Sequence, residues 1–300
     1  DREPRAIRMS ALQTAIPLRP GDAVATVAPS SALDDDQRLQ EGLAVLRGWG
    51  LCPLEQNVSA RRWGHLAGTD QERYIDLCQE APLLACARGG WGSARLLERS
   101  IPWKPGWLLG FSDVTSLLWS RLRAGLAGGI HGPLLTTLGA EPAWSQERLR
   151  QLLFGETPPA LKGEPRGGGQ TTGPLLAANL TVASHLLGSD HVPELQGAIL
   201  ILEDVGEAPY RIDRMLTHWR LCGALQQLGG IGFGQFEGCE RSPDDPLTTT
   251  LSSVLDDRTA DLNIPVVKNL PVGHICGNAA LPMGQLACLD GNLGSLSLVA

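Results

Sequence analysis

Short apolar runs alternate with amphipathic segments through the first half of the chain. Apolar runs of strand length occupy residues 23–28, 82–87 and 107–109. Leucines at helical spacing follow the acidic triplet at 34–36, namely Leu39, Leu43 and Leu46. A capping box from Thr69 to Glu72 marks the start of a second helix. Strands that alternate with helices predict an α/β fold, with a parallel sheet covered by helices on both faces.

The second half has a different pattern. Its most apolar run, 198–202, predicts a buried strand that ends at Glu203-Asp204, and residues 179–187 and 209–221 have helical patterns. Shorter strands are expected at 231–236, 265–267, 285–289 and 295–299. The stretch 156–172 is rich in proline and glycine, which predicts a linker between a domain at 1–155 and a mixed domain at 173–300.

Composition excludes several classes of function. The chain has 300 residues and a net charge of −7, without a long basic run, so we expect no nucleic-acid partner. We find neither a secretory signal nor an apolar stretch of about 18 residues, so we expect no membrane partner. The seven cysteines are scattered without a C-x-x-C pair. This usage is typical of reduced thiols and predicts a cytoplasmic protein. The sequence has no metal-ligand spacing, and we expect neither a metal nor a cofactor.

The segment Gly110-Phe111-Ser112-Asp113 lies where a predicted strand meets a predicted helix. A serine at such a turn has an exposed hydroxyl, and the amides at the helix start favour an oxyanion, as in a nucleophile elbow. Val114 replaces the last glycine of the usual G-x-S-x-G pattern. The alternative is that Ser112 or Asp113 only caps the helix.

A nucleophilic serine needs a base, and the base needs an acid that orients it. His131 follows a predicted strand, whereas His274 lies in a loop beside a glycine. Glu203 follows the most apolar strand of the second half, where an unpaired carboxylate is costly. Glu203 either orients a histidine or pairs with a nearby arginine. Ser112, Glu203 and His274 would then meet in a cleft between the two halves.

Arg88-Gly89-Gly90-Trp91-Gly92 follows another predicted strand. Glycine lets the backbone approach a reacting carbonyl, so we predict an oxyanion hole formed by the N–H groups of Gly90 and Asp113. A plain tight turn is the alternative. Arg88 is our first candidate for binding a substrate carboxylate. Arg211 and Arg214 are further candidates, but the pattern slightly favours structural pairing with Glu207 or Asp213 for them.

Several motifs together resemble the LD-carboxypeptidases of serine peptidase family S66. They are Arg88-Gly89-Gly90-Trp91-Gly92, Gly110-Phe111-Ser112-Asp113, the segment from Glu203 to Arg214, and Gly273-His274, with support from 27–31 and 173–180. The resemblance extends from about Gly21 to the C-terminus, and the segment that begins at Glu203 is the most specific part. The sequence departs from the family at Trp91, where tyrosine is usual, and at Ala177-Ala178, where glycines are common. The resemblance implies that Trp91 is a candidate wall of the substrate site.

The resemblance implies a Ser112–Glu203–His274 triad. It also implies a Rossmann-like N-terminal domain and a smaller, β-rich C-terminal domain. Family members are cytosolic, metal-free and commonly homodimeric, and they remove the terminal D-alanine from murein tetrapeptides during cell-wall recycling. One branch instead hydrolyses peptidyl-nucleotide antibiotics of the microcin C type and confers immunity. A non-catalytic muropeptide-binding module on the same fold is the alternative from another class.

Overall fold

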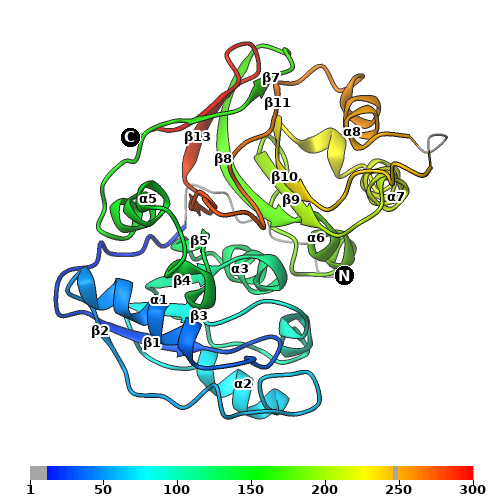
Figure 1. Ribbon diagram of the computed structural model, residues 1–300. Helices are drawn as coiled ribbons and strands as arrows, with labels where there is room; N and C mark the ends of the chain where they lie inside the picture. The colour runs from blue at the N-terminus through cyan, green and yellow to red at the C-terminus, as the bar shows by residue number, and fades with distance from the viewer. Residues whose placement is uncertain (1–11, 246–248, 300) are drawn as a thin grey trace, which may run out of the picture.

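The structure, a computed structural model, describes residues 12–245 and 249–299. Its first sheet confirms the predicted parallel arrangement and runs in the order β12-β5-β4-β3-β1-β2 (Figure 1). The strands are β1 (Ala23–Val27), β2 (Cys52–Pro53), β3 (Leu83–Cys86), β4 (Trp107–Gly110), β5 (Gly129–His131) and β12 (Leu281–Pro282). Neighbours from β2 to β5 are parallel, whereas β12 pairs antiparallel with β5. The second half of the chain therefore contributes an edge strand to this sheet.

The helices of the first half follow the hydrophobic pattern. They are α1 (Gln37–Gly48), α2 (Asp70–Leu77), α3 (Thr115–Arg123), α4 (Leu135–Leu138) and α5 (Ala143–Leu153). The three leucines at helical spacing in α1 are buried, as their spacing predicts. The capping box is present at the start of α2, where Thr69 and Glu72 bond each other's backbone N–H groups. Sequence pattern and local chemistry agree at α1 and α2, which form where they are predicted, whereas the pattern did not predict α5.

The second sheet is mixed and runs in the order β6-β14-β13-β8-β9-β10-β11-β7. Its parallel centre is β8 (Gln170–Asn179), β9 (Ile199–Val205), β10 (Gly230–Glu237) and β11 (Val266–Lys268). The flanking antiparallel strands are β6 (Leu161–Lys162), β7 (Glu164–Pro165), β13 (Leu286–Asp290) and β14 (Ser295–Leu298). The region 156–172, predicted as a linker, thus contains β6, β7 and the start of β8.

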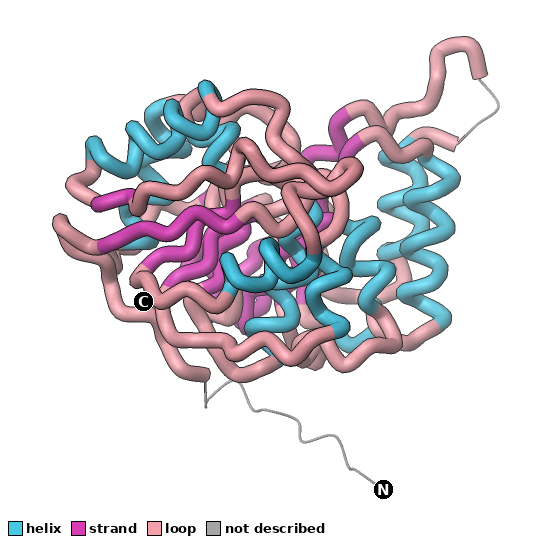
Figure 2. Tube along the Cα trace, turned by 90° about the horizontal axis from the view of Figure 1, so that it is seen from below, coloured by secondary structure: helices cyan, strands magenta, loops and turns pink. Residues whose placement is uncertain are grey.

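Helices α6 (Leu180–Leu186), α7 (Pro209–Leu221) and α8 (Leu251–Thr259) lie along one side of the second sheet (Figure 1). Seen from below, the strands lie between groups of helices (Figure 2). One continuous apolar cluster joins the two halves. In it, Trp119 of α3 and Trp219 of α7 meet edge to face with ring centroids 6.1 Å apart, and the Trp119 indole donates to the carbonyl of Ala177. The shared core fixes the position of each half relative to the other.

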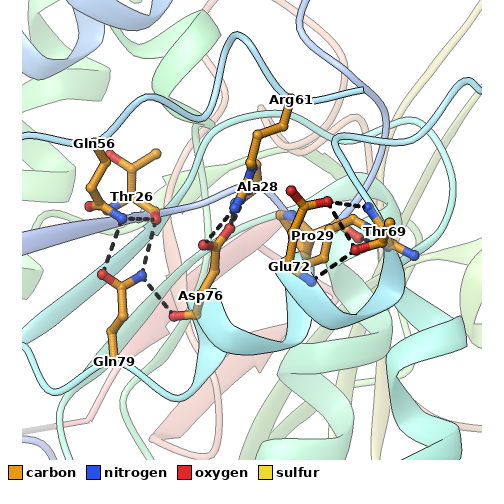
Figure 3. Close-up of polar contacts among 10 residues, drawn as sticks. Thr26, Ala28, Pro29, Gln56, Arg61, Thr69, Glu72, Asp76 and Gln79 are labelled. Carbon is orange, nitrogen blue, oxygen red and sulfur yellow. Dashed lines mark hydrogen bonds and ion pairs between the residues drawn. The ribbon is translucent and has the colours of Figure 1, made fainter. Parts of the chain in front are cut away.

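A polar network holds the carboxyl end of β1 (Figure 3). The buried carboxylate of Asp76, on α2, accepts a hydrogen bond from the backbone N–H of Ala28 and two from the guanidinium of Arg61. Next to it, the side chains of Gln56 and Gln79 donate to the carbonyl of Thr26. These contacts fix where the chain leaves the sheet, and the loop that follows leads to the site described below.

Candidate active site

Ser112 lies at the carboxyl end of β4, in the turn that leads into α3. A short 3₁₀ turn, Ser112–Val114, precedes the helix, so the helix begins slightly later than the pattern predicts. Ser112 has φ 62°, which L residues adopt only at a cost of about 1–3 kcal/mol. This left-handed conformation at a strand-to-helix turn is the backbone geometry of a nucleophile elbow.

The structure brings Ser112, His274 and Glu203 together. His274 Nε2 lies 3.0 Å from Ser112 Oγ, and His274 Nδ1 lies 2.7 Å from Glu203 Oε2. Because the carboxylate can only accept, the proton of the neutral imidazole lies on Nδ1 and the lone pair of Nε2 faces the serine. The Glu203 side chain is fully buried and that of His274 is 23% exposed. The hydrogen-bonded chain therefore leads from a buried carboxylate to a hydroxyl that solvent can reach.

Local backbone geometry explains the glycine before His274. Gly273 has φ +134°, and a Cβ there would lie 3.0 Å from the carbonyl oxygen of Gln235 and 3.1 Å from Glu203 Cβ. A side chain would therefore displace the loop from the end of β9. Only glycine lets the histidine loop approach the buried carboxylate this closely.

Burial and pairing act in opposite directions on the pKa values of the pair. Burial disfavours the charged form of His274, but the hydrogen bond and negative charge of Glu203 outweigh it and raise the pKa of His274 above its usual value. Complete burial raises the pKa of the Glu203 carboxyl, although His274 opposes the shift. A histidine with a raised pKa is a stronger base toward the serine hydroxyl.

His131 is close to the site but does not reach the serine. Its ring is completely buried, and burial lowers its pKa to about 3, so it stays neutral. Phe111 lies between the two histidines, with ring centroids 4.8 Å from His274 and 5.6 Å from His131. Of the two histidines the sequence left open, only His274 contacts Ser112.

The glycine turn after β3 lies beside the serine. A Cβ on Gly89 would come 3.2 Å from Ser112 Oγ, and a Cβ on Gly90 (φ +100°) would lie 2.2 Å from Ser31 Oγ. The same Ser31 hydroxyl accepts a hydrogen bond from the backbone N–H of Trp91. A side chain at Gly90 would therefore displace the turn, and one at Gly89 would crowd the side chain of Ser112.

Asp113 has a role that the sequence did not reveal. Its buried carboxylate accepts hydrogen bonds from the Ser30 hydroxyl at 2.6 Å and from the Ser93 backbone N–H at 2.8 Å. Burial raises its pKa, against these hydrogen bonds. Asp113 thereby connects the loop after β1, the turn after β3 and the serine turn. The signal was the pair of serines at 30–31 after an apolar strand.

Two adjoining cavities form a cleft over the serine and the histidine. One, of about 270 Å³, contains Ser112, Gly90 and Arg88 in its lining, and the other, of about 440 Å³, reaches Glu141 and Cys276. Both are lined by Arg38, Phe111, Thr136, Thr137 and His274. Trp91 is 49% exposed and does not line either cavity.

The other candidate arginines have structural partners. Arg211 forms an ion pair with Glu207 at 3.4 Å, as slightly favoured by the sequence, and the guanidinium of Arg214 lies over the ring of Tyr210. Neither lines the two cavities. In the part of the chain that the structure describes, no group of three or more His, Cys, Asp or Glu side chains has metal-binding geometry.

Ser112 is hydrogen-bonded to a histidine–carboxylate pair, and it lies at the carboxyl end of a parallel strand. This arrangement defines a serine hydrolase of the α/β class. Comparison with protein families gives the same class. The LD-carboxypeptidase N-terminal domain of peptidase family S66 matches residues 24–132, and the corresponding C-terminal domain matches residues 172–289. The chain belongs to the LD-carboxypeptidase family S66 and is a serine carboxypeptidase.

Curated relatives cover nearly the whole chain. The putative carboxypeptidase slr1534 of Synechocystis sp. is 46% identical over 293 residues, which is 95% of this chain and 96% of the relative. The murein tetrapeptide carboxypeptidase of Pseudomonas aeruginosa is 35% identical, over 90% of this chain and 93% of its own length.

Solved structures share the fold. The muramoyltetrapeptide carboxypeptidase from Oxalobacter formigenes has a TM-score of 0.79 at 26% identity and covers 92% of this chain and 97% of its own. The microcin C7 immunity protein MccF, in complex with glutamyl sulfamoyl guanosine, has a TM-score of 0.84 at 19% identity, with 97% and 98% covered. At that identity the second likeness concerns the fold alone. Among the described residues, no helix combines the length and apolarity needed to cross a membrane.

Proposed function

We propose that this protein is an LD-carboxypeptidase that removes the terminal D-alanine from murein tetrapeptides, a reaction of cell-wall recycling. The observation that carries the proposal is the hydrogen-bonded chain from Ser112 through His274 to Glu203 on the floor of an open cleft. The relative named murein tetrapeptide carboxypeptidase supports the choice of substrate.

In the first half of the reaction, Ser112 Oγ attacks the carbonyl carbon of the amide that precedes D-alanine. His274 Nε2 accepts the hydroxyl proton, and Glu203 stabilises the resulting imidazolium. The N–H groups of Gly90 and Asp113 hold the oxyanion of the tetrahedral intermediate. The C–N bond then breaks, and His274 donates its proton to the nitrogen of the departing D-alanine.

In the second half, water attacks the acyl-enzyme ester. His274 accepts a proton from the water as its oxygen bonds to the carbonyl carbon, and returns it to Ser112 Oγ when the ester bond breaks. The products are a tripeptide with a free carboxylate and D-alanine. Complete burial of Glu203 keeps water from competing for its hydrogen bond to His274.

We also propose a domain organisation and an oligomeric state for this protein. We propose that the first domain (1–155) carries the nucleophile and that the second (173–300) carries the acid and the base, with catalysis between them. The resemblance to the family supports a cytoplasmic homodimer, and light scattering of the purified protein measures its oligomeric state.

Two alternative functions are distinguished by the assay described below. A peptidyl-nucleotide hydrolase would use the same serine, and its support is likeness to MccF in fold. In that case Trp91 is a candidate to stack on the base. A non-catalytic muropeptide-binding module would not need the hydrogen bonds that connect the three side chains.

One experiment separates these functions. The purified protein and its Ser112→Ala variant are incubated with murein tetrapeptide and with a peptidyl sulfamoyl adenosine, and the products are identified by mass. We expect tripeptide and D-alanine from the parent and a loss of rate on the order of 10⁶ in the variant, the usual effect of removing a triad nucleophile. Cleavage of the nucleotide alone would support the immunity function. Binding without cleavage would support the module.

A further inference from the structure

A carboxypeptidase must recognise the free carboxylate at the end of its substrate, and this inference rests on the proposed function. A guanidinium binds a carboxylate through two parallel hydrogen bonds. The arginines that line the cleft are Arg88 in one cavity and Arg38 in both. Which of them is free to bind a substrate depends on the contacts that each already makes.

One nitrogen of the Arg88 guanidinium already has two partners. Its Nη1 donates to the carbonyl of Ala32 at 2.5 Å and lies 3.1 Å from a carboxylate oxygen of Asp34. These contacts connect the turn after β3 to the loop before α1. A substrate carboxylate would therefore meet a guanidinium that is already held to this loop and already paired with the carboxylate of Asp34.

Arg38 is in the opposite situation. It is the second residue of α1, its side chain is exposed, and it lines both cavities together with His274. Its backbone N–H donates to Asp35, but among the described residues its guanidinium has no hydrogen-bond or ion-pair partner. The guanidinium of Arg38 is therefore available to a ligand in the cleft.

The acidic groups around Arg38 do not neutralise it directly. Asp34 pairs with Arg88, and the carboxylate of Glu41 accepts from the Gln37 side chain at 2.9 Å. Asp35 contributes a carboxylate at the same rim. These negative charges repel a carboxylate that has no direct contact with a cation, so recognition of one here needs the guanidinium itself.

We propose that Arg38 binds the terminal carboxylate of the peptide substrate and thereby determines the preference for a free peptide end. Arg38 lines the same two cavities as His274, which protonates the leaving amine in the proposed reaction. The leaving D-alanine carries both the amine and the carboxylate, so it would lie between His274 and Arg38.

The test compares a tetrapeptide acid with the same tetrapeptide amidated at its C-terminus. The parent should prefer the acid by about ten- to hundredfold in kcat/KM, which is the usual effect of one charge-assisted hydrogen bond to the substrate. Arg38→Gln should reduce the acid-to-amide ratio to near one, and Arg38→Lys should restore part of it. Arg47→Gln, on the last turn of the same helix and outside both cavities, should keep the parental ratio.

Three results would overturn the assignment. If Arg38→Gln keeps the parental acid-to-amide ratio of kcat/KM, Arg38 does not bind the carboxylate. A ratio near one in Arg88→Gln would then assign this role to Arg88. If the parent cleaves acid and amide equally well, no residue of the cleft recognises the free end. If the parent cleaves neither peptide, the proposed function fails and this inference fails with it.

Discussion

The carboxylate of Glu141 accepts a hydrogen bond at 3.0 Å from the backbone N–H of Asn278, which lies 137 residues further along the chain. It also accepts one from the N–H of Gly277 at 2.9 Å. The side chain of Asn278 in turn accepts from the N–H of Gly273, next to His274. A buried carboxylate before α5 thus anchors both ends of the loop that carries the histidine.

We expect this anchor to matter for turnover more than for substrate binding. Glu141→Leu leaves two buried N–H groups without an acceptor and lets the loop move, and a displacement of about 1 Å at a reacting group can cost 10²-fold in kcat. Glu141→Gln keeps an acceptor oxygen and should stay near the parental kcat. The measurement is kcat and KM for both variants, with thermal unfolding to show that they are folded. Equal kcat in the two variants would contradict the anchoring role.

The sequence predicts α1, α2 and α7 because local chemistry and core burial agree there. The bounds of α7 follow from a proline at its first position and Gly223 after its end. The pattern did not predict α5, α8 or the two-residue strand β12. Strand β12 forms only because Leu281 pairs with His131 across 150 residues of chain. That pairing is a tertiary contact, which no local pattern contains.

The acidic end of β9 shows the same limit. The apolar run predicts a strand that ends at Glu203-Asp204, and β9 continues one residue further, to Val205. Glu203 pairs in register with Asn179 of β8, and the side chain of Asn179 donates to Asp204. Glu203 and Asp204 remain in the strand because His274 and Asn179, from distant segments, hydrogen-bond to them.

The three site residues could be proposed from sequence because each is a reactive type at the end of a strand or beside a glycine. The choice among arginines could not be made in this way. Arg88 and Arg38 differ in what their guanidinium groups already contact, and Ala32 and Asp34 become partners of Arg88 only when the chain is folded. Sequence position alone does not report such contacts.

The glycine turn gives a second prediction, for Gly90→Ala. A Cβ there would lie 2.2 Å from Ser31 Oγ, so the turn must shift, and the residue would also have to keep φ +100°. Loss of one oxyanion donor usually costs about 10²–10³ in kcat. Gly21→Ala is the matched control, since Gly21 has φ +95° with nothing within 4 Å of the added Cβ. A parental kcat in Gly90→Ala would remove Gly90 from the oxyanion hole.

A third prediction concerns Arg73, which is completely buried beneath the same turn. Its guanidinium donates to the carbonyls of Pro29 and Gly92 and pairs with Asp70. Arg73→Met leaves these buried acceptors unpaired, which costs about 1–3 kcal/mol for each one. We expect a clearly lower free energy of unfolding in a denaturant titration.

Arg95 provides the control for Arg73, because it pairs with the same Asp70 from a more exposed position, at 2.8 Å. Arg95→Gln removes only a partly exposed ion pair, and should cost less than about 1 kcal/mol. Equal losses in Arg73→Met and Arg95→Gln would show that the ion pair to Asp70, and not the two carbonyls, accounts for the stability.

The last prediction is a pH dependence controlled by Glu203. His274 must be neutral to accept the serine proton, so kcat/KM of the parent should rise with pH as His274 loses its proton. Because Glu203 raises the pKa of His274, the midpoint of this rise should lie above about 6.5, the usual histidine value. Glu203→Gln removes the negative charge beside His274. The burial of His274 remains, and burial lowers the pKa of its imidazole. The midpoint should therefore move to lower pH, while the maximal kcat falls on the order of 10⁴.

An NMR titration of His274 in the Ser112→Ala background measures the same pKa without turnover. The pKa should fall when Glu203→Gln is added to this background. Glu207→Gln is the matched control, because it removes a carboxylate from the same segment that pairs with Arg211 and not with His274. An unchanged or higher pKa in the Glu203 variant would mean that this carboxylate does not stabilise the imidazolium. The triad would then reduce to a serine and a histidine, with Glu203 acting only on the orientation of the ring.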